Sequence, residues 1–159
     1  MRSNSIVSKG FSLIELLIAI AILGVVMSVG IPAYQGYLET AKMTKVSAAY
    51  DFSVRLAQQT YSKDSARIAM GLASTLPDST TTWLELFDED DESLAPGGGP
   101  LFISGRPRNR RVISETGAIN VRFNRRKQRL EIYRPNYKRL KGYRAIVTRD
   151  ETILEEWSR

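Results

Sequence analysis

The stretch KGFSLIELLIAIAILGVVMSVGIPAY, residues 9–34, contains the apolar run that decides the architecture of the chain. Residues 11–31 in a single helix would rise by about 30 Å, which matches the hydrocarbon thickness of a bilayer. A cleaved secretory signal has a shorter apolar core, of about 7–15 residues. A buried helix of a soluble domain would need a polar face, which this segment lacks. We therefore predict a single membrane-spanning helix.

Two basic residues, Arg2 and Lys9, precede the apolar run. Positive charges close to a span stay in the cytoplasm, whereas a long translocated domain largely escapes this rule. The sequence therefore predicts a cytoplasmic N-terminus, with the remainder of the chain on the outer side of the membrane.

One acid, Glu15, lies near the start of the apolar run, and no basic residue accompanies it there. A carboxylate within a span costs free energy and usually marks a functional contact. A cut after Gly10 would give Phe11 a free α-amine four residues before Glu15, on the same helix face. That amine would be largely protonated at neutral pH. The pair can form within one helix or between neighbouring subunits, and the residues alone leave both open.

The segment KGFSLIE, from Lys9 to Glu15, resembles the processing motif of type IV pilins and of the related pseudopilins of type II secretion systems. The resemblance covers roughly the first 45 residues. It includes Gly24 and Pro32, at positions where the family commonly has a helix-loosening glycine and a kinking proline. Small residues in the same run would allow close helix approach.

The resemblance implies that a prepilin peptidase cleaves between Gly10 and Phe11 and methylates the new Phe11 amine. Glu15 would then neutralise the amine of a neighbouring subunit. The implied partners are further copies of the chain, other pilins, the peptidase, the assembly platform and the inner membrane. The precursor would be a single-pass inner-membrane protein, and the product an extracellular pilus or a periplasmic pseudopilus.

The chain contains neither histidine nor cysteine. This absence removes most general bases, thiol nucleophiles and transition-metal ligand sets. Since serine, lysine and tyrosine form no catalytic motif, we expect no enzyme, no cofactor and no metal site. The chain departs from many pilins, which hold their distal loop with a C-terminal cysteine pair, and salt pairing between the acidic run of residues 78–95 and the basic sheet is our hypothesis for its replacement.

Charge is segregated along the chain, although its net value is only +6. Residues 78–95 contain seven acids and no Lys or Arg. From Arg106 onward the chain contains sixteen Lys or Arg but only six Asp or Glu. We expect the acidic run to pair with the basic region, within the chain or between subunits. A calcium site at Asp88, Asp90 and Glu92 is the alternative, although the run lacks EF-hand spacing.

After Pro32, apolar or small residues recur every three or four positions to about residue 61, which predicts an amphipathic helix. Its expected inner stripe is Tyr34, Tyr37, Leu38, Ala41, Ala49, Phe52, Leu56 and Thr60. Residues 62–105 carry mostly loop signals, with a short helical turn near 66–72. Apolar and polar residues then alternate in three segments, which predicts the strands of an antiparallel meander: AINVRFN, RLEIYR and YRAIVTR. An earlier strand is expected in LFISG or RRVIS.

The outer face of this sheet is expected to be basic, with Arg122, Glu131, Arg134 and Arg144 on it. Basic faces bind phosphate groups without sequence specificity, so contact with DNA through Arg122, Arg134 and Arg144 is one interpretation. Subunit packing against an acidic loop is the other.

The sequence thus predicts an α+β, pilin-like fold, with a long N-terminal helix packed on an antiparallel sheet of 3–4 strands. Residues 1–10 are the leader, 11–32 the membrane and filament-core helix, and 33–159 the globular head. Within the head, the sheet is expected at about 106–149, followed by a C-terminal tail. The expected function is a structural subunit of a type IV pilus, for adhesion, motility or DNA uptake. A type II secretion pseudopilin, a minor or DNA-binding pilin and an anchored binding module that never polymerises are the alternatives.

Overall fold

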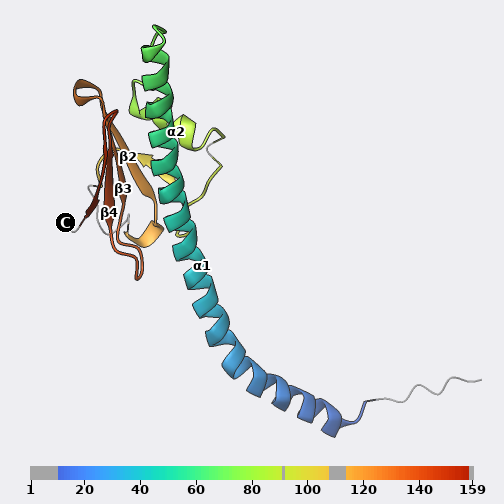
Figure 1. Ribbon diagram of the computed structural model, residues 1–159. Helices are drawn as coiled ribbons and strands as arrows, with labels where there is room; N and C mark the ends of the chain where they lie inside the picture. Colours follow the sequence, from blue (N-terminus) through green and yellow to red (C-terminus); the bar gives the residue numbers. More distant parts are fainter. Residues whose placement is uncertain (1–10, 91, 108–113, 158–159) are drawn as a thin grey trace, which may run out of the picture. The chain divides into compact units, whose positions relative to one another are not determined.

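The computed structural model describes residues 11–90, 92–107 and 114–157 (Figure 1). The chain divides into two compact units, Met1–Thr40 and Ala41–Arg159. Helix α1, Leu13–Ala69, contributes to both units, and every other element belongs to the second. The predicted α+β class, with a long N-terminal helix and a largely antiparallel C-terminal sheet, is confirmed.

The second unit contains a five-stranded sheet in the order β1-β2-β3-β4-β5. Its elements after α1 are α2 (Thr80–Phe87), β1 (Phe102–Ser104), β2 (Ile119–Asn124), the 3-10 turn η1 (Arg125–Lys127), β3 (Arg129–Arg134), β4 (Tyr143–Val147) and β5 (Thr152–Glu156). Antiparallel pairings join β2 to β3 and β3 to β4, as the alternating segments predicted. In addition, β4 pairs with β5 antiparallel, and β1 pairs with β2 in parallel.

Two strands depart from the predicted meander of 3–4 strands within about 106–149. Strand β1 lies in LFISG, one of the two segments expected to supply an earlier strand. It pairs with β2 in parallel, whereas the sequence predicted an antiparallel sheet. Strand β5 lies in the expected C-terminal tail. Its residues are exposed or half-buried, so the alternation that reveals a buried strand is missing. Most of the alternative RRVIS lies outside the described residues.

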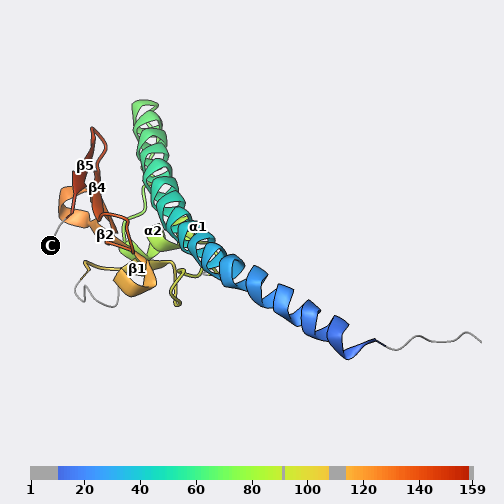
Figure 2. The same cartoon turned by 90° about the horizontal axis from the view of Figure 1, so that it is seen from below.

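Helix α1 covers one face of the sheet through residues 46–61 (Figures 1 and 2). The buried stripe is Val46, Tyr50, Val54, Ala57 and Tyr61. These positions keep the helical spacing but differ from the expected stripe. Phe52, which was expected inside, is 53% exposed.

The helix ends at Ala69 rather than at about residue 61. Gly71 follows with φ +76°, a left-handed conformation that suits glycine at a helix end. Its N–H bonds to the Ile68 carbonyl, and the N–H of Leu72 bonds to the Arg67 carbonyl. These bonds satisfy terminal carbonyls that the helix leaves unpaired, and the helical turn expected near 66–72 is the end of α1 itself.

Helix α2 lies in the interval that the sequence predicts as loop. Ser79 caps it by accepting a hydrogen bond from the Thr82 N–H, at 3.1 Å. Trp83 is fully buried, with its ring centroid 5.7 Å from Tyr61 and 6.3 Å from Phe123. This short helix therefore fills the core between α1 and the sheet with its largest side chain.

Candidate functional sites: the N-terminal segment and the arginine cluster

The apolar side chains of residues 11–31 are uncovered on every side of the helix. Exposure of the large ones ranges from 50% at Ile18 to 87% at Leu13. By length and composition, α1 has one stretch able to cross a membrane. An apolar surface of this extent requires lipid or other apolar helices around it.

Glu15 makes a contact that the sequence reading missed. Its carboxylate accepts a hydrogen bond from the Ser12 backbone N–H, at 2.9 Å. Ser12 precedes the first helical residue, so Ser12-x-x-Glu15 has the spacing of a capping box. A serine followed by glutamate three residues later, before an apolar run, was the available signal. Glu15 therefore stabilises the start of its own helix here.

The other predicted residues of this segment are placed as follows. Phe11 lies just before α1 and is 86% exposed, whereas Gly10 lies outside the described residues. Gly24 and Pro32 lie within α1, which runs through both as a helix. A methyl group at Gly24 would meet nothing within 4 Å. Pro32 removes the N–H that would bond to the Ser28 carbonyl. Loosening at these positions stays a prediction for the assembled state.

On the face of the sheet opposite α1, arginines surround a fully buried carboxylate, that of Glu131. Arg129 donates a hydrogen bond to Oε1, and the Tyr133 hydroxyl donates one to Oε2 at 2.6 Å. Arg122, directly across from Glu131 in the β2–β3 pairing, and Arg106 form ion pairs with Oε2 at 3.6 and 3.7 Å. We call Arg106, Arg122, Arg129 and Glu131 the arginine cluster.

The arginine cluster keeps Glu131 ionised. Burial on its own would raise the pKa of Glu131, but the hydrogen bond from Tyr133 and the charges of Arg129 and Arg106 hold that pKa below its usual value. Burial and the hydrogen bond to Glu131 raise the pKa of the Tyr133 hydroxyl.

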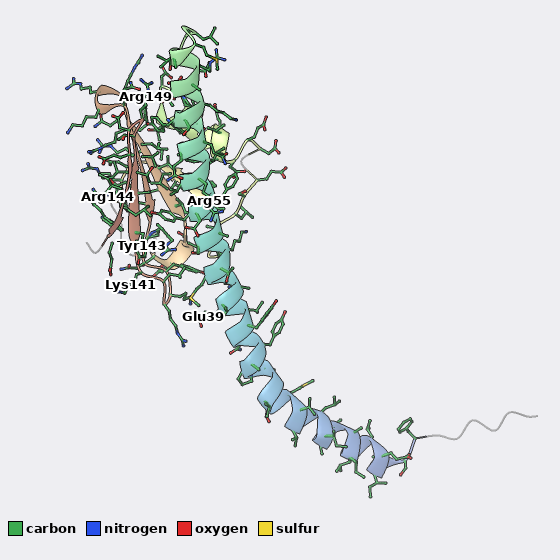
Figure 3. All side chains as sticks on the ribbon, viewed as in Figure 1. Glu39, Arg55, Lys141, Tyr143, Arg144 and Arg149 are labelled. Atoms are coloured by element: carbon green, nitrogen blue, oxygen red, sulfur yellow. The ribbon has the colours of Figure 1, made fainter. Side chains whose placement is uncertain are left out.

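The three arginines of the DNA interpretation do not share one surface. Arg122 belongs to the arginine cluster. Arg144 belongs to the neighbouring β4 (Figure 3). It pairs with Glu155, and the hydrogen bond to that carboxylate raises the pKa of Arg144. Arg134 is only 7% exposed and its guanidinium bonds to Ser47 of α1, at 3.0 Å. The expected place of Arg134 on the outer face is wrong, because it has the parity of the core residues Leu130 and Ile132.

Arg134 serves the packing of the helix on the sheet. Its guanidinium lies over the rings of Tyr50 and Tyr143, at 5.3 and 4.9 Å from their centroids, and bonds to the Lys141 carbonyl. Such stacking suits a planar cation that is partly desolvated.

A second buried carboxylate, Asp64, joins the end of α1 to two loops. Its Oδ1 accepts from the Ser74 hydroxyl at 2.7 Å and the Thr75 N–H at 2.9 Å, while Oδ2 accepts from Arg149 at 2.7 Å. Burial would raise the pKa of Asp64, but these hydrogen bonds and the Arg149 charge lower it. No sequence pattern indicates this site, because its charged partner, Arg149, lies 85 residues from Asp64 along the chain.

The described residues of the acidic run make few ionic contacts with the rest of the described chain. Asp78 pairs with Arg125 at 3.6 Å, and Asp88 accepts the Ser93 N–H at 3.1 Å. Among the described residues, no three carboxylates gather closely enough to hold a metal ion. The expected pairing of this run with the basic sheet is therefore limited to Asp78 and Arg125 in the described chain.

Comparison with known proteins concerns the N-terminal segment. Residues 7–31 match the family described as "Prokaryotic N-terminal methylation motif". The chain is 51% identical over 39 residues to the type IV major alpha-pilin of Moraxella bovis, which is 24% of each chain. It is 50% identical over 36 residues to the prepilin peptidase-dependent protein D of Escherichia coli, 23% of this chain and 25% of that protein.

A third relative is the type IV major fimbrial protein FimA of Dichelobacter nodosus, 45% identical over 38 residues and 24% of each chain. The chain thus matches about a quarter of the length of these relatives. No solved structure matches it. The family resemblance found in the motif is confirmed, and it resides in the N-terminal segment.

Proposed function

Because the N-terminal segment of this chain is that of the type IV pilin family, we propose that the chain is a structural subunit of a pilus filament. The observation that carries the proposal is the apolar helix of residues 11–31, whose large side chains are 50–87% exposed. In the precursor its cover is the inner membrane, and in the filament it is the same segment of neighbouring copies.

Processing belongs to the same proposal. A prepilin peptidase cuts between Gly10 and Phe11 and methylates the Phe11 amine, and an assembly platform moves the mature chain into the fibre. The fibre serves adhesion, motility or DNA uptake. Mass spectrometry of sheared surface fibres tests the processing step, because it requires a mature chain that begins at a methylated Phe11. An unprocessed or unmethylated N-terminus in the fibre would contradict it.

In the filament, Glu15 pairs with the Phe11 amine of a neighbouring subunit. The hydrogen bond that it accepts from Ser12 offers a competing explanation, in which Glu15 only caps its own helix. Glu15→Gln separates the two roles, because glutamine can also accept the Ser12 N–H in a capping box but carries no charge. Glu15→Ala removes both contacts.

The expected result is a loss of fibres in both variants, with processed chain remaining in the membrane. Glu39→Ala is the matched control, because Glu39 is a half-buried acid of α1 that lies outside the apolar run, and fibres are expected from it (Figure 3). Electron microscopy of sheared material and immunoblots of membrane fractions measure both outcomes. Normal fibres from Glu15→Gln would refute the ion pair and leave only the cap.

A further inference from the structure

We propose that the arginine cluster is a binding site for a phosphate dianion, either free phosphate or the terminal group of a phosphomonoester. The site lies at the pocket between the end of β1 and strand β2, which has a volume of about 480 Å³. Ser104, Gly105, Arg106 and Arg122 line this pocket. Its size falls in the range of small-molecule sites.

Charge is the first argument for an anion. Glu131 supplies one negative charge to three guanidinium groups, those of Arg106, Arg122 and Arg129, and none of the three has another acidic partner in the described chain. Two positive charges therefore remain uncompensated beside a partly enclosed pocket, where screening by water is weaker than in bulk solvent. A phosphate dianion carries the matching charge.

Hydrogen-bond geometry is the second argument. The distances from Arg106 and Arg122 to Glu131 Oε2, 3.7 and 3.6 Å, exceed those of a hydrogen bond. Neither arginine donates a hydrogen bond elsewhere in the described part of the chain. Both guanidiniums thus approach one point, with their N–H donors left for a ligand.

Glu131 acts as a positioning residue in this site. Arg129 and the Tyr133 hydroxyl already hold its carboxylate, and it is fully buried in the sheet. It attracts Arg106 and Arg122 to one place without using their donors. Arg122 is further fixed by its place in β2, directly across from Glu131.

The arrangement favours phosphate over a carboxylate. Guanidinium groups bind the oxygens of phosphate through paired N–H donors, and a tetrahedral dianion can accept from two arginines and the Ser104 hydroxyl at once. A carboxylate offers two oxygens in one plane and a single charge. A phosphodiester also carries a single charge, so the linkages of a nucleic acid should bind more weakly than a monoester.

The test measures binding of inorganic phosphate to the full chain, solubilised in a detergent without phosphate groups, by isothermal titration calorimetry. Arg106→Gln is the informative variant, because Arg106 is 57% exposed at its side chain and its loss leaves Arg129 and Tyr133 on Glu131. Arg126→Gln is the matched control, an equal charge change in the exposed turn η1.

We expect Arg106→Gln to weaken phosphate binding at least tenfold and Arg126→Gln to change it less than twofold. Equal weakening in the two variants would show nonspecific attraction and overturn the proposal, as would no binding to the wild-type chain. Tryptophan fluorescence confirms that each variant is folded, since Trp83 is fully buried.

Three further ligands identify the source of the phosphate group. Glucose 6-phosphate binding as well as inorganic phosphate supports a phosphomonoester, and binding of inorganic phosphate alone supports the free ion. A short oligonucleotide without a terminal phosphate should bind at least tenfold more weakly. A peptide of residues 85–92 represents the acidic run of a second copy, and tighter binding of that peptide or of the oligonucleotide would overturn the proposal. None of these measurements requires filament assembly, so their failure would leave the proposed function untouched.

Discussion

The buried carboxylate Asp64 gives the sharpest prediction for the stability of the second unit. It is 1% exposed and accepts three hydrogen bonds, from Ser74, Thr75 and Arg149. The two bonds from uncharged donors contribute about 1 kcal/mol each. The hydrogen bond from Arg149 should contribute a similar free energy, because that side chain is 44% exposed and water screens its charge. Asp64→Ala should therefore lower the free energy of unfolding by about 3 kcal/mol.

Asp64→Asn isolates the charge. The asparagine oxygen can replace Oδ1 and keep the bonds from Ser74 and Thr75, but its amide group would meet the Arg149 guanidinium donor to donor. We expect a loss of about 1–2 kcal/mol at neutral pH. The folded pKa of Asp64 is lowered, so the stability it contributes is present above its ordinary pKa of about 4 and is lost as the pH falls through the folded value.

The assay is urea unfolding of the full chain in detergent, followed by tryptophan fluorescence at pH 7 and at successively lower pH. The difference between the wild-type chain and Asp64→Asn should shrink below about pH 4. Asp51→Asn, on the exposed side of the same helix, is the control and should change the unfolding free energy by less than about 0.5 kcal/mol. A difference between the wild type and Asp64→Asn that stays constant down to the lowest pH would refute the reasoning.

Three other changes test the packing of the second unit. Trp83→Ala empties the fully buried centre and should cost about 3–5 kcal/mol, measured by thermal unfolding with circular dichroism; a loss below about 1 kcal/mol would contradict the assigned core. Gly117→Ala should destabilise the protein more than Gly71→Ala. Both glycines have φ +76°, but only at Gly117 would the new methyl group lie 3.0 Å from Tyr137 and Val46. Equal losses of stability in the two variants would argue against this close contact. Burial raises the pKa of Tyr50 and Tyr61 to about 12, and the pKa of Tyr133 is also raised, so ultraviolet absorbance should show at least three tyrosines ionising late. The stability that Tyr50 and Tyr61 contribute by staying neutral is fully present below about pH 10 and falls as the pH rises towards 12.

The sequence predicts those elements in which core and polar residues alternate along a short segment, so that one face is buried and the other is not. Strands β2, β3 and β4 alternate core residues such as Val121, Ile132 and Ala145 with polar ones, and the structure contains all three. Strand β5 was missed because the edge of the sheet leaves its residues largely exposed. Helix α2 was missed because it opens with three threonines, which are poor helix formers, and only Ser79 and the Trp83–Phe87 spacing indicate it.

Two charged residues of β3 show how the parity of a strand position decides the face on which a side chain lies. Glu131 and Arg134 are three positions apart in one strand, so they point to opposite faces, and a basic outer face that includes both could not form. Their true partners come from tertiary pairing. Arg122 meets Glu131 through the β2–β3 register, and Arg134 meets Ser47 across 87 residues of chain. No pattern in a single sequence identifies such contacts.

The two units differ in how far their apolar side chains are buried, so substitutions in the two units should have different effects. The second unit buries its own core, with Trp83, Ile119 and Ile132 almost wholly removed from solvent. In the described residues of the first unit the large apolar side chains are at least 40% exposed, and a methyl group at Gly24, Gly30 or Gly36 would meet nothing within 4 Å. Conservative changes in residues 11–31 should therefore leave the unfolding of the second unit unchanged and act on membrane insertion or assembly. Nothing within 4 Å in the described chain requires a small residue at these glycines, and the close helix packing of the proposed filament would require one.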